Sequence, residues 1–547
     1  MAAVGASGVA AMAGGFLEGH HRATEGTEGT EQNINEIVVD SDAGYASVPL
    51  RGLPGSVVKG RWRLGEPRRP KRERDRRPAL NSLLVAVGAA LSISLSPPLA
   101  AAQQARAPDF DALGFEAAER LGEYIRVRTV NPPGNETAGA RWMQQVLARE
   151  GIVAAIFESS PGRGNLYARL PGTGAKRPVV LLSHIDVVPA SDSAWHVGPW
   201  SGETRSGAVW GRGALDMKGT AVVQMMTMIA LKRRGVRLAR DVILVANADE
   251  EASSTGAEWF AREKKALLRN AEFLLNEGGY NRLTPEGLIK YFGIGVTEKV
   301  PYWLRLTAHG APGHASVPRP DNPAERISRA LGRIAAWRTP VRLTPPAERY
   351  FKDLATRERD PRYRRWLADP AAALRDTAGL RFFTSNLYYD AILRNTVSIT
   401  VLKGSDKINV IPPEASAELD VRLLPGERPA EFVSEVRRVI ADPRVEITPL
   451  RPEREATTSP LDGAMMEAIQ EAVHAMEPGA LITTPMNAGF TDSYYYRALG
   501  IGAYGISPFR LSEEDARTVH GTDERVTVGN LRFGVEFMYR IVERVAR

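Results

Sequence analysis

The sequence feature that most constrains the fold is a repeated unit in which an apolar strand runs straight into an acidic or histidine-bearing loop. The segment PVVLLSHIDVVP is apolar from Val179 to Leu182 and turns polar where it ends, and DVILVANADEE repeats this plan. A strand that is apolar on both faces is typical of a mostly parallel sheet with helices on each side. Helical patterns surround these strands, at residues 115–126, 137–150 and 217–233. From about Pro108 the sequence therefore predicts an α/β domain whose ligand site lies at the strand ends.

A second domain is predicted to interrupt the first, since a chain of 547 residues is too long for one ordinary core. From about Pro301 the strands alternate polar and apolar residues, as in WLRLTAHG and ILRNTVSITVLKG. After about Leu461 the long helices and glycine-bounded strands return. Within the second domain, the charged and proline-punctuated residues 339–381 are expected to form an extra helical excursion. We therefore expect a catalytic domain in two parts, at residues 108–298 and 453–547, around a smaller α+β lid domain at residues 299–452.

The N-terminal region has the composition of an export signal and not of a folded domain. Residues 1–80 are rich in small and polar residues, show no apolar periodicity and end in a basic run, so they are expected to be disordered. At residues 81–102 an apolar core is followed by prolines and by Ala100 and Ala102, which fit a signal cleavage site. The interpretation is a periplasmic or secreted protein. The alternative is an uncleaved membrane anchor at residues 81–102, although the apolar core is short for a bilayer span.

Composition removes several classes of function. The chain contains no cysteine, so a metal ion could be held only by His, Asp and Glu, and a cysteine nucleophile is excluded. The net charge is +7, but its densest basic cluster lies at residues 61–77. No interleaving of basic and aromatic residues follows in the part expected to fold, so nucleic acid is not an expected partner.

Five short segments carry acidic or histidine residues at strand ends or in glycine-rich loops: SHIDVVP, GRGALDMKG, ADEEAS, LLNEGG and VHGTDE. A site for two zinc ions needs such a set, because it combines neutral imidazoles with carboxylates, one of which can bridge both ions. In the spacing of His184 and Asp186, the histidine can bind metal while the aspartate orients its second ring nitrogen. In the pair Glu250 and Glu251, one carboxylate can bind metal while the other takes a proton from water.

Each segment has a plainer interpretation when it is taken alone. A single histidine near a strand end is more often a hydrogen-bonded structural residue, and adjacent glutamates usually form a solvated turn. The chain has 8 histidines, two of them near the N-terminus. Chance alone rarely supplies five such segments at strand ends, so the combination favours a dinuclear metal site.

Longer segments resemble those of a known family. SHIDVVPA, WGRGALDMKG, ADEEASSTGA, APGHASVP, INVIPPEASAELDVRLLPG, GFTDSYYYR and HGTDERV are similar, in order, to blocks of the zinc metallopeptidases that include aminoacylase, glutamate carboxypeptidase, carnosine dipeptidase and succinyl-diaminopimelate desuccinylase. The resemblance spans about residues 110–545, and GVTEKV and LLNEGG look most like the branch of yeast Gly-Xaa carboxypeptidase and the N-acyl amino acid hydrolases. It implies a phosphorylase/hydrolase-like catalytic domain and a lid domain through which two copies form a homodimer.

The resemblance also implies a ligand set for two zinc ions, for which Co²⁺ or Mn²⁺ could substitute. One ion would be held by His184, Asp216 and Glu277, and the other by Asp216, Glu251 and His520. Asp216 would bridge the two ions. Glu272 is the alternative to Glu277 on the same segment, but the frame of LLNEGG places the family's carboxylate at Glu277.

Further residues acquire roles from the same resemblance. Glu250 would be the general base, Asp186 would orient His184, and His314 would reach the partner subunit's site and stabilise the oxyanion. The substrate would be bound by Asn409, Arg422 and Gly489. Two plainer alternatives remain: His314 as a loop residue beside Gly313, and Arg422 as a structural ion-pair partner of Asp420.

The predicted function is zinc-dependent hydrolysis of an amide or peptide bond next to a free carboxylate, in a small peptide or an N-acyl amino acid. A non-catalytic peptide-binding module on the same fold is disfavoured because Glu250 and every expected ligand are present. Carbamoyl or ureido hydrolysis is disfavoured because neither the glutamate pair nor the ligand set departs from the pattern of the amidohydrolases.

Overall fold

The computed structural model of this chain describes residues 107–547. The expectations of disorder at residues 1–80 and of a signal or anchor segment at residues 81–102 lie outside the described residues. Within residues 107–547, no helix has both the length and the apolar character that crossing a bilayer requires.

A six-stranded sheet forms the centre of the catalytic domain. The strands β6, β3, β7 and β18 pair in parallel, and β1 and β2 add an antiparallel edge. The expected α/β class with a mostly parallel sheet is confirmed. The sheet order is β1 (Ala154–Glu158), β2 (Gly164–Leu170), β6 (Val242–Asn247), β3 (Val179–His184), β7 (Phe273–Asn276) and β18 (Gly502–Gly505).

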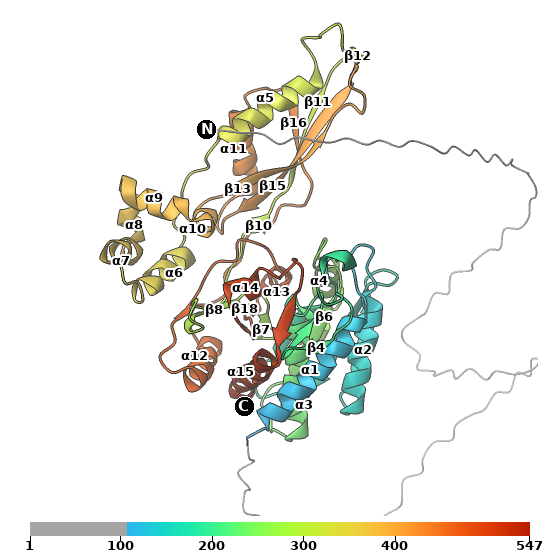
Figure 1. Cartoon of the computed structure of the whole chain (residues 1–547), viewed down its shortest axis with the longest axis vertical. Helices are drawn as coiled ribbons and strands as arrows, with labels where there is room; N and C mark the ends of the chain where they lie inside the picture. Colours follow the sequence, from blue (N-terminus) through green and yellow to red (C-terminus); the bar gives the residue numbers. More distant parts are fainter. Residues whose placement is uncertain (1–106) are drawn as a thin grey trace, which may run out of the picture. The chain divides into compact units, whose positions relative to one another are not determined.

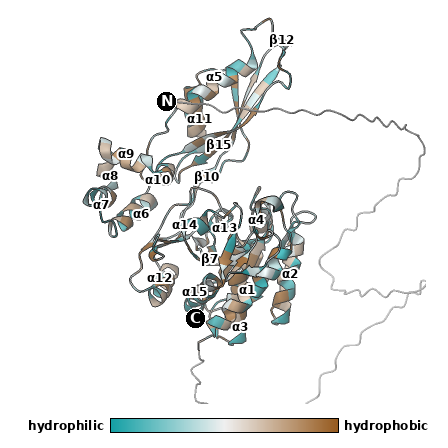
Figure 2. Cartoon of the chain, viewed as in Figure 1, coloured by the Kyte–Doolittle hydropathy of each residue, from teal (hydrophilic) through white to brown (hydrophobic). Residues whose placement is uncertain are grey.

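Helices cover both faces of this sheet because its buried strands alternate between two cores. In β3, Val179 and Leu181 pack into one core, and Val180 and Leu182 pack into another. Figure 1 shows α15 beside α1 and α3, and Figure 2 shows hydrophobic residues concentrated in the strands around β7. The first core is covered by α1 (Phe110–Arg126), α2 (Glu136–Arg149), α3 (Lys218–Arg233), α12 (Ala464–Met476) and α15 (Val528–Ala546), and the second by α4 (Thr255–Glu263) and α13 (Ser493–Arg497).

The lid domain is an antiparallel sheet with two helices packed on it. Strand β15 places every second side chain in the lid core, and α5 begins where the side chain of Asn322 accepts a hydrogen bond from Ala324 N and Pro323 occupies the first turn. The sheet contains β10 (Val300–Pro301), β15 (Glu414–Leu423), β11 (Leu304–His309), β16 (Val445–Pro449) and β13 (Thr396–Lys403). The helices are α5 (Pro323–Ala336) and α11 (Pro429–Ile440), and a separate pair is formed by β12 (Gly313–His314) and β14 (Val410–Ile411).

The expected helical excursion is present and is longer than residues 339–381. Its helices are α6 (Pro345–Ala355), α7 (Pro361–Ala368), α8 (Pro370–Ala373), α9 (Thr377–Ser385) and α10 (Leu387–Ile392). We call residues 345–392 the helical insertion. The segment ILRN, expected to open a strand, instead contains the last residue of α10 and the turn after it, and β13 begins at Thr396. The helix starts at Asn386, whose side chain accepts hydrogen bonds from the amides of Tyr388 and Tyr389.

The C-terminal segment returns to the catalytic domain and adds strands to its sheets. Besides β18 in the main sheet, it supplies β17, β19 and β20 to two smaller sheets, and α14 (Glu513–Ala516) precedes His520. One small sheet has the order β17 (Ile482–Thr483), β9 (Ile289–Gly293), β8 (Tyr280–Leu283) and β19 (Arg510–Leu511). The other has the order β20 (Arg525–Thr527), β5 (Ala208–Trp210) and β4 (Thr204–Arg205).

Candidate metal centre

Two histidines and three carboxylates from five distant segments lie together at the carboxyl ends of the main strands. His184 is the last residue of β3, and its Nε2 lies 3.1 Å from Asp216 Oδ1 and 3.7 Å from Glu277 Oε1. His520 Nε2 lies 3.1 Å from Asp216 Oδ2 and 3.1 Å from Glu251 Oε2. The structure therefore brings together all five residues expected to be ligands. Glu272, the alternative to Glu277, instead forms ion pairs with Arg177 and Arg240.

Asp216 occupies the middle of this cluster. One of its carboxylate oxygens faces His184 and the other faces His520. A carboxylate that offers its two oxygens to opposite sides has the geometry needed to bridge two cations. In two groups, His184 with Asp216 and Glu251, and His184 with Glu250 and Glu277, the potential ligand atoms all lie within 4.8 Å of one another. The donors are imidazole nitrogens and carboxylate oxygens, so the cluster fits a pair of divalent cations with an affinity for nitrogen and oxygen.

The electrostatics of the cluster show an excess of buried negative charge. Burial raises the pKa of Glu250 and that of Glu277 well above the ordinary value. The charge of Glu277 raises the pKa of Glu250 further, and the charge of Asp216 raises that of Glu277. Burial opposes protonation of His184, but the surrounding carboxylates raise its pKa well above the usual range. Hydrogen bonds to Asp216 and Glu251 raise the pKa of His520 to about 10. Cations placed among these groups would relieve the repulsion that otherwise favours protonation.

Asp186 positions the loop that carries Glu250 and Glu251. Its carboxylate accepts hydrogen bonds from the backbone amides of Glu250 at 3.0 Å and Glu251 at 3.1 Å. The ring of His184 is held by the backbone carbonyl of Asp186, which lies 2.9 Å from Nδ1, whereas the carboxylate lies 3.6 Å away. Asp186 therefore orients the histidine through its main chain and the glutamate pair through its side chain.

A second layer of buried polar residues was not predicted from the sequence. Asn131 donates from Nδ2 to Asp186 Oδ2 at 2.8 Å and to Asp249 Oδ1 at 2.9 Å, so one amide holds two carboxylates. Arg163 forms ion pairs with Asp249 and with Glu136. Asp249 has a left-handed backbone (φ 70°), which turns the chain just before Glu250. In the sequence, Asn131 is marked only by its place in the segment TVNPPG, which lies in the loop after α1.

Glu524 holds the loop that carries Asp216 in place. This role of Glu524 was not predicted from the sequence. This fully buried carboxylate accepts hydrogen bonds from the amides of Gly213 at 3.0 Å, Leu215 at 2.8 Å and Asp216 at 3.0 Å. It also pairs with Arg212 at 2.6 Å. The segment VHGTDE contains Glu524, so the motif marked the region, but the sequence pattern does not reveal three amide partners about 310 positions earlier in the chain.

A pocket of about 270 Å³ opens on the cluster. Its lining includes the carboxylates, with Glu250 among them, and Gly489, which was expected to bind the substrate. The lining also includes five apolar residues, Leu215, Ile506, Phe509, Leu511 and Val519. A pocket that combines carboxylates with apolar side chains can accommodate a polar reacting bond attached to an apolar group.

The expected catalytic residue His314 and the other two expected substrate-binding residues, Asn409 and Arg422, lie on the lid, and among residues 107–547 they make no interaction with the cluster. His314 is exposed on β12, and its Nδ1 lies 2.7 Å from Ser316 Oγ. Asn409 is exposed, and its carbonyl accepts a hydrogen bond from Ala315 N. Both nitrogens Nε and Nη2 of Arg422 donate to the carboxylate of Asp420, at 2.7 and 3.1 Å. These contacts match the alternative in which Arg422 is an ion-pair partner of Asp420.

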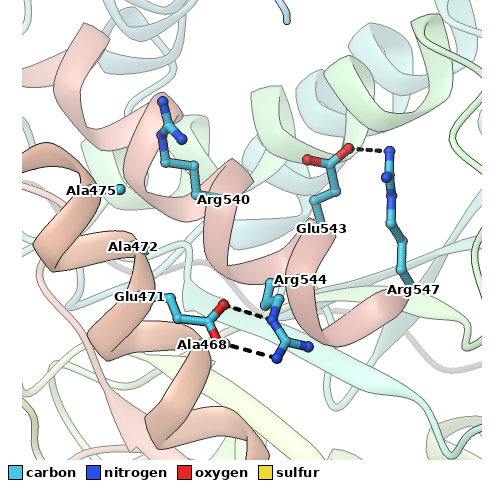
Figure 3. A pocket seen from close by; sticks show the side chains of 8 residues that line it. All are labelled: Ala468, Glu471, Ala472, Ala475, Arg540, Glu543, Arg544 and Arg547. Atoms are coloured by element: carbon cyan, nitrogen blue, oxygen red, sulfur yellow. Dashed lines mark hydrogen bonds and ion pairs between the residues drawn. The ribbon is translucent and has the colours of Figure 1, made fainter. Parts of the chain in front are cut away.

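A larger hollow between α12 and α15 has a different character. It measures about 390 Å³, and Figure 3 shows Glu471 paired with Arg544 and Glu543 paired with Arg547. Arg540, which also lines it, pairs with Glu536. Its charged side chains are thus neutralised by each other, and it offers no group comparable to those around Asp216.

Comparisons with known proteins agree with this fold. Residues 180–544 match the model of peptidase family M20/M25/M40. The N-fatty-acyl-amino acid synthase/hydrolase PM20D1 of Xenopus tropicalis is 30% identical over 446 residues, covering 78% of this chain and 85% of its own. Aminoacylase-1A of Rattus norvegicus is 26% identical over 78% of this chain and 94% of its own. An M20 family metallo-carboxypeptidase of Sulfolobus solfataricus has the same fold, with 18% identity and a TM-score of 0.59 over 78% of this chain and 98% of its own. The chain therefore belongs to peptidase family M20/M25/M40.

Proposed function

We propose that this amide hydrolase acts on N-acyl amino acids and small peptides with a free carboxylate, and that two zinc ions fill its metal centre. The observation that carries the proposal is the carboxylate of Asp216, which faces His184 with one oxygen and His520 with the other. Zinc suits a site built from imidazoles and carboxylates in a chain without cysteine. Co²⁺ and Mn²⁺ are the natural substitutes for a test of metal identity.

Catalysis at this centre requires a group that moves a proton. When bound, a pair of divalent cations supplies Lewis acidity, which lowers the pKa of water and polarises the carbonyl group of the amide. Glu250 lies in the pocket beside the ligands, and within residues 107–547 no hydrogen bond or ion pair engages its carboxylate. Glu250 therefore takes a proton from the attacking water on a carboxylate oxygen and returns it to the nitrogen of the departing amine.

The lining of the pocket supports an N-acyl amino acid with an apolar group. Ile506, Phe509 and Leu511 line the same pocket as Glu250, so an apolar group can contact them while the amide meets Glu250. The names of two similar proteins, an N-fatty-acyl-amino acid synthase/hydrolase and an aminoacylase, point to the same substrate class.

The decisive test replaces Glu250 with alanine. We expect Glu250→Ala to lower kcat by at least about a thousandfold, because the proton carrier is lost, and to keep its two metal ions. Release of amino acid from N-acetyl-phenylalanine and from dipeptides gives the rate, and elemental analysis gives the metal content. The exposed variant Glu513→Ala is the control and should behave as the unaltered protein. Loss of both metal ions in Glu250→Ala would show that Glu250 is a ligand and not the base.

We also propose that two copies form a homodimer through the lid. His314 and Asn409 stand on the exposed β12 and β14 region, which supports their use on a partner's substrate. Exposed apolar side chains surround them and continue along the edge strand β13, as an interface would require. These side chains are Val317, Ile399, Leu402, Ile408 and Val410.

A further inference from the structure

The helical insertion belongs to the lid by sequence, yet it packs against the catalytic domain. Its hydrophobic core includes Met486, which is fully buried and comes from the C-terminal segment. The hydroxyl of Tyr388 donates to the carbonyl of Met486 at 2.7 Å, and the hydroxyl of Thr483 donates to Asp353 Oδ2 at 2.8 Å. The ring of Tyr350 meets that of Tyr291 on β9 edge to face, with their centroids 6.3 Å apart. The insertion is therefore attached to the sheet that carries one side of the pocket.

The stretch from Met486 to Gly489 contacts the helical insertion on one side and lines the pocket on the other. Met486 and Ala488 pack into the core of the insertion, whereas Asn487 and Gly489 line the pocket. The residues that face the insertion and the residues that line the pocket are therefore direct neighbours along the chain. Any displacement of the insertion side of this stretch would move the pocket side by a similar distance.

Tyr388 stands behind this wall. Burial raises the pKa of Tyr388 well above its ordinary value, and the neighbouring hydroxyls of Tyr291 and Tyr280 raise it further. Tyr280 itself lines the pocket from β8. Tyr388 thus backs the wall beside Tyr280, and it fixes the backbone of Met486 by a direct hydrogen bond.

We infer that the helical insertion is a specificity-determining element of the catalytic site, which sets how the site discriminates between acyl groups by holding the wall from Met486 to Gly489 in place. Tyr388 is the positioning residue. The inference rests on the proposed function, since it concerns which N-acyl amino acids the site accepts. This wall bounds the pocket of about 270 Å³ through Asn487 and Gly489.

The first experiment compares Tyr388→Phe with Tyr389→Phe. Tyr389 is the adjacent residue of α10, its ring lies in the same aromatic cluster, and within the described residues its hydroxyl makes no hydrogen bond. The substrates are N-acetyl-, N-hexanoyl- and N-dodecanoyl-phenylalanine. Tyr388→Phe leaves the buried carbonyl of Met486 without its partner, a loss that corresponds to about a five- to tenfold change in an equilibrium.

For Tyr388→Phe we expect KM for the N-acetyl substrate to rise about five- to tenfold, with kcat and metal content within about twofold of those of the unaltered protein. The preference for N-acetyl over N-dodecanoyl substrate should fall by the same factor. Tyr389→Phe should keep both values. Equal substrate profiles in the two variants, or a loss in kcat alone, would overturn the inference while leaving the proposed function intact.

A second measurement needs no substrate and separates this inference from the proposed function. Hydrogen exchange of the peptide covering residues 485–491 should be faster in Tyr388→Phe than in Tyr389→Phe. Thr483→Val, which removes the second anchor to Asp353, should act in the same direction even if Tyr388→Phe folds poorly. Unchanged exchange in both variants would overturn the inference whatever the activity. Absence of hydrolysis of every substrate by the unaltered protein would overturn the proposed function instead.

Discussion

Lys299 is buried with its ammonium group surrounded by oxygen atoms, at the point where the chain enters the lid. Its Nζ donates to the carbonyls of Ala391 at 3.0 Å and Arg394 at 2.9 Å, and to Thr396 Oγ1 at 2.9 Å. These contacts tie the start of the lid to the end of the helical insertion. Burial, reinforced by repulsion from Arg422, lowers the pKa of Lys299 from 10.5 to about 7.

This lowered pKa predicts how the stability depends on pH. Between about pH 7 and pH 10 the unfolded chain holds the proton of Lys299 while the folded chain has released it, so the free energy of unfolding rises with pH. Relative to Lys299→Met, which has no such proton, the unaltered protein should gain about 2 kcal/mol between pH 7 and pH 9. Guanidinium unfolding of both proteins at the two pH values measures this difference. Parallel pH profiles would contradict a lowered pKa.

The sequence indicated the individual ligands better than their supports. The short motifs at strand ends and in glycine-rich loops marked the five segments, and the family resemblance then singled out His184, Asp216, Glu251, Glu277 and His520 within them. The supporting roles of Asn131 and Glu524 were not predicted, because their partners come near only in the folded chain. Some of these partners are backbone amides, which no sequence pattern identifies. Arg422 forms an ion pair with Asp420, and the role in substrate binding that the family resemblance implies for it stays a prediction.

At the scale of elements, the loop before α3 depends on a clamp from the other end of the chain. Glu524→Gln replaces one of the two carboxylate oxygens, which accept from Leu215 and Asp216 on one side and from Gly213 and Arg212 on the other, by an NH2 group that cannot accept. It also leaves Arg212 buried without its counter-charge. We expect the free energy of unfolding to fall by about 3 kcal/mol. Metal affinity should fall as well, because Asp216 loses its fixed position. Thermal denaturation with and without zinc and metal titration measure both effects.

The control for this prediction is Glu514→Gln, which alters an exposed glutamate on α14 that also pairs with an arginine. An exposed pair contributes little to stability, so this variant should unfold within about 1 kcal/mol of the unaltered protein. Equal effects of the two substitutions would mean that the buried clamp does not hold the Asp216 loop.

Elements with a strong apolar pattern were predicted well, and elements set by local caps were not. The strand expected at residues 179–182 is β3, and the helix expected at residues 217–233 is α3, with ends that differ by one or two residues. The predicted end of the helical insertion was wrong, because the apolar, branched side chains at the start of ILRN are typical of a strand. The cap at Asn386 and the packing of α10 on Met486 outweigh that preference.

At the scale of the whole molecule, the proposed homodimer predicts complementation between two inactive variants. His314→Ala lacks the lid histidine, and Glu250→Ala lacks the base, so a mixed dimer should contain one complete site made from the two subunits. Mixing equal amounts after dissociation and reassociation should recover up to about a quarter of the unaltered activity, the statistical share of complete sites. No recovery with mixed dimers present would exclude the shared site.

The order of domains along the chain could be inferred because strand patterns change character at the boundaries. Near Pro301, strands that are apolar on both faces give way to strands that alternate, as in β11, where Leu304, Leu306 and Ala308 are buried and Arg305 is exposed. The attachment of the helical insertion to the catalytic domain could not be inferred in this way. Its contacts depend on single hydroxyl groups such as those of Tyr388 and Thr483, and many tyrosines and threonines in a sequence look alike.

The late position of β18, His520 and α15 in the chain has a consequence for synthesis on the ribosome. Strand β7 gains its outer neighbour, and Asp216 gains its second histidine, only after the entire lid has been made. A nascent chain that has finished the lid but not the C-terminal segment exposes the open backbone edge of β7, a template for pairing with other chains. Premature termination there would yield an aggregation-prone fragment that holds four of the five expected ligands and lacks His520.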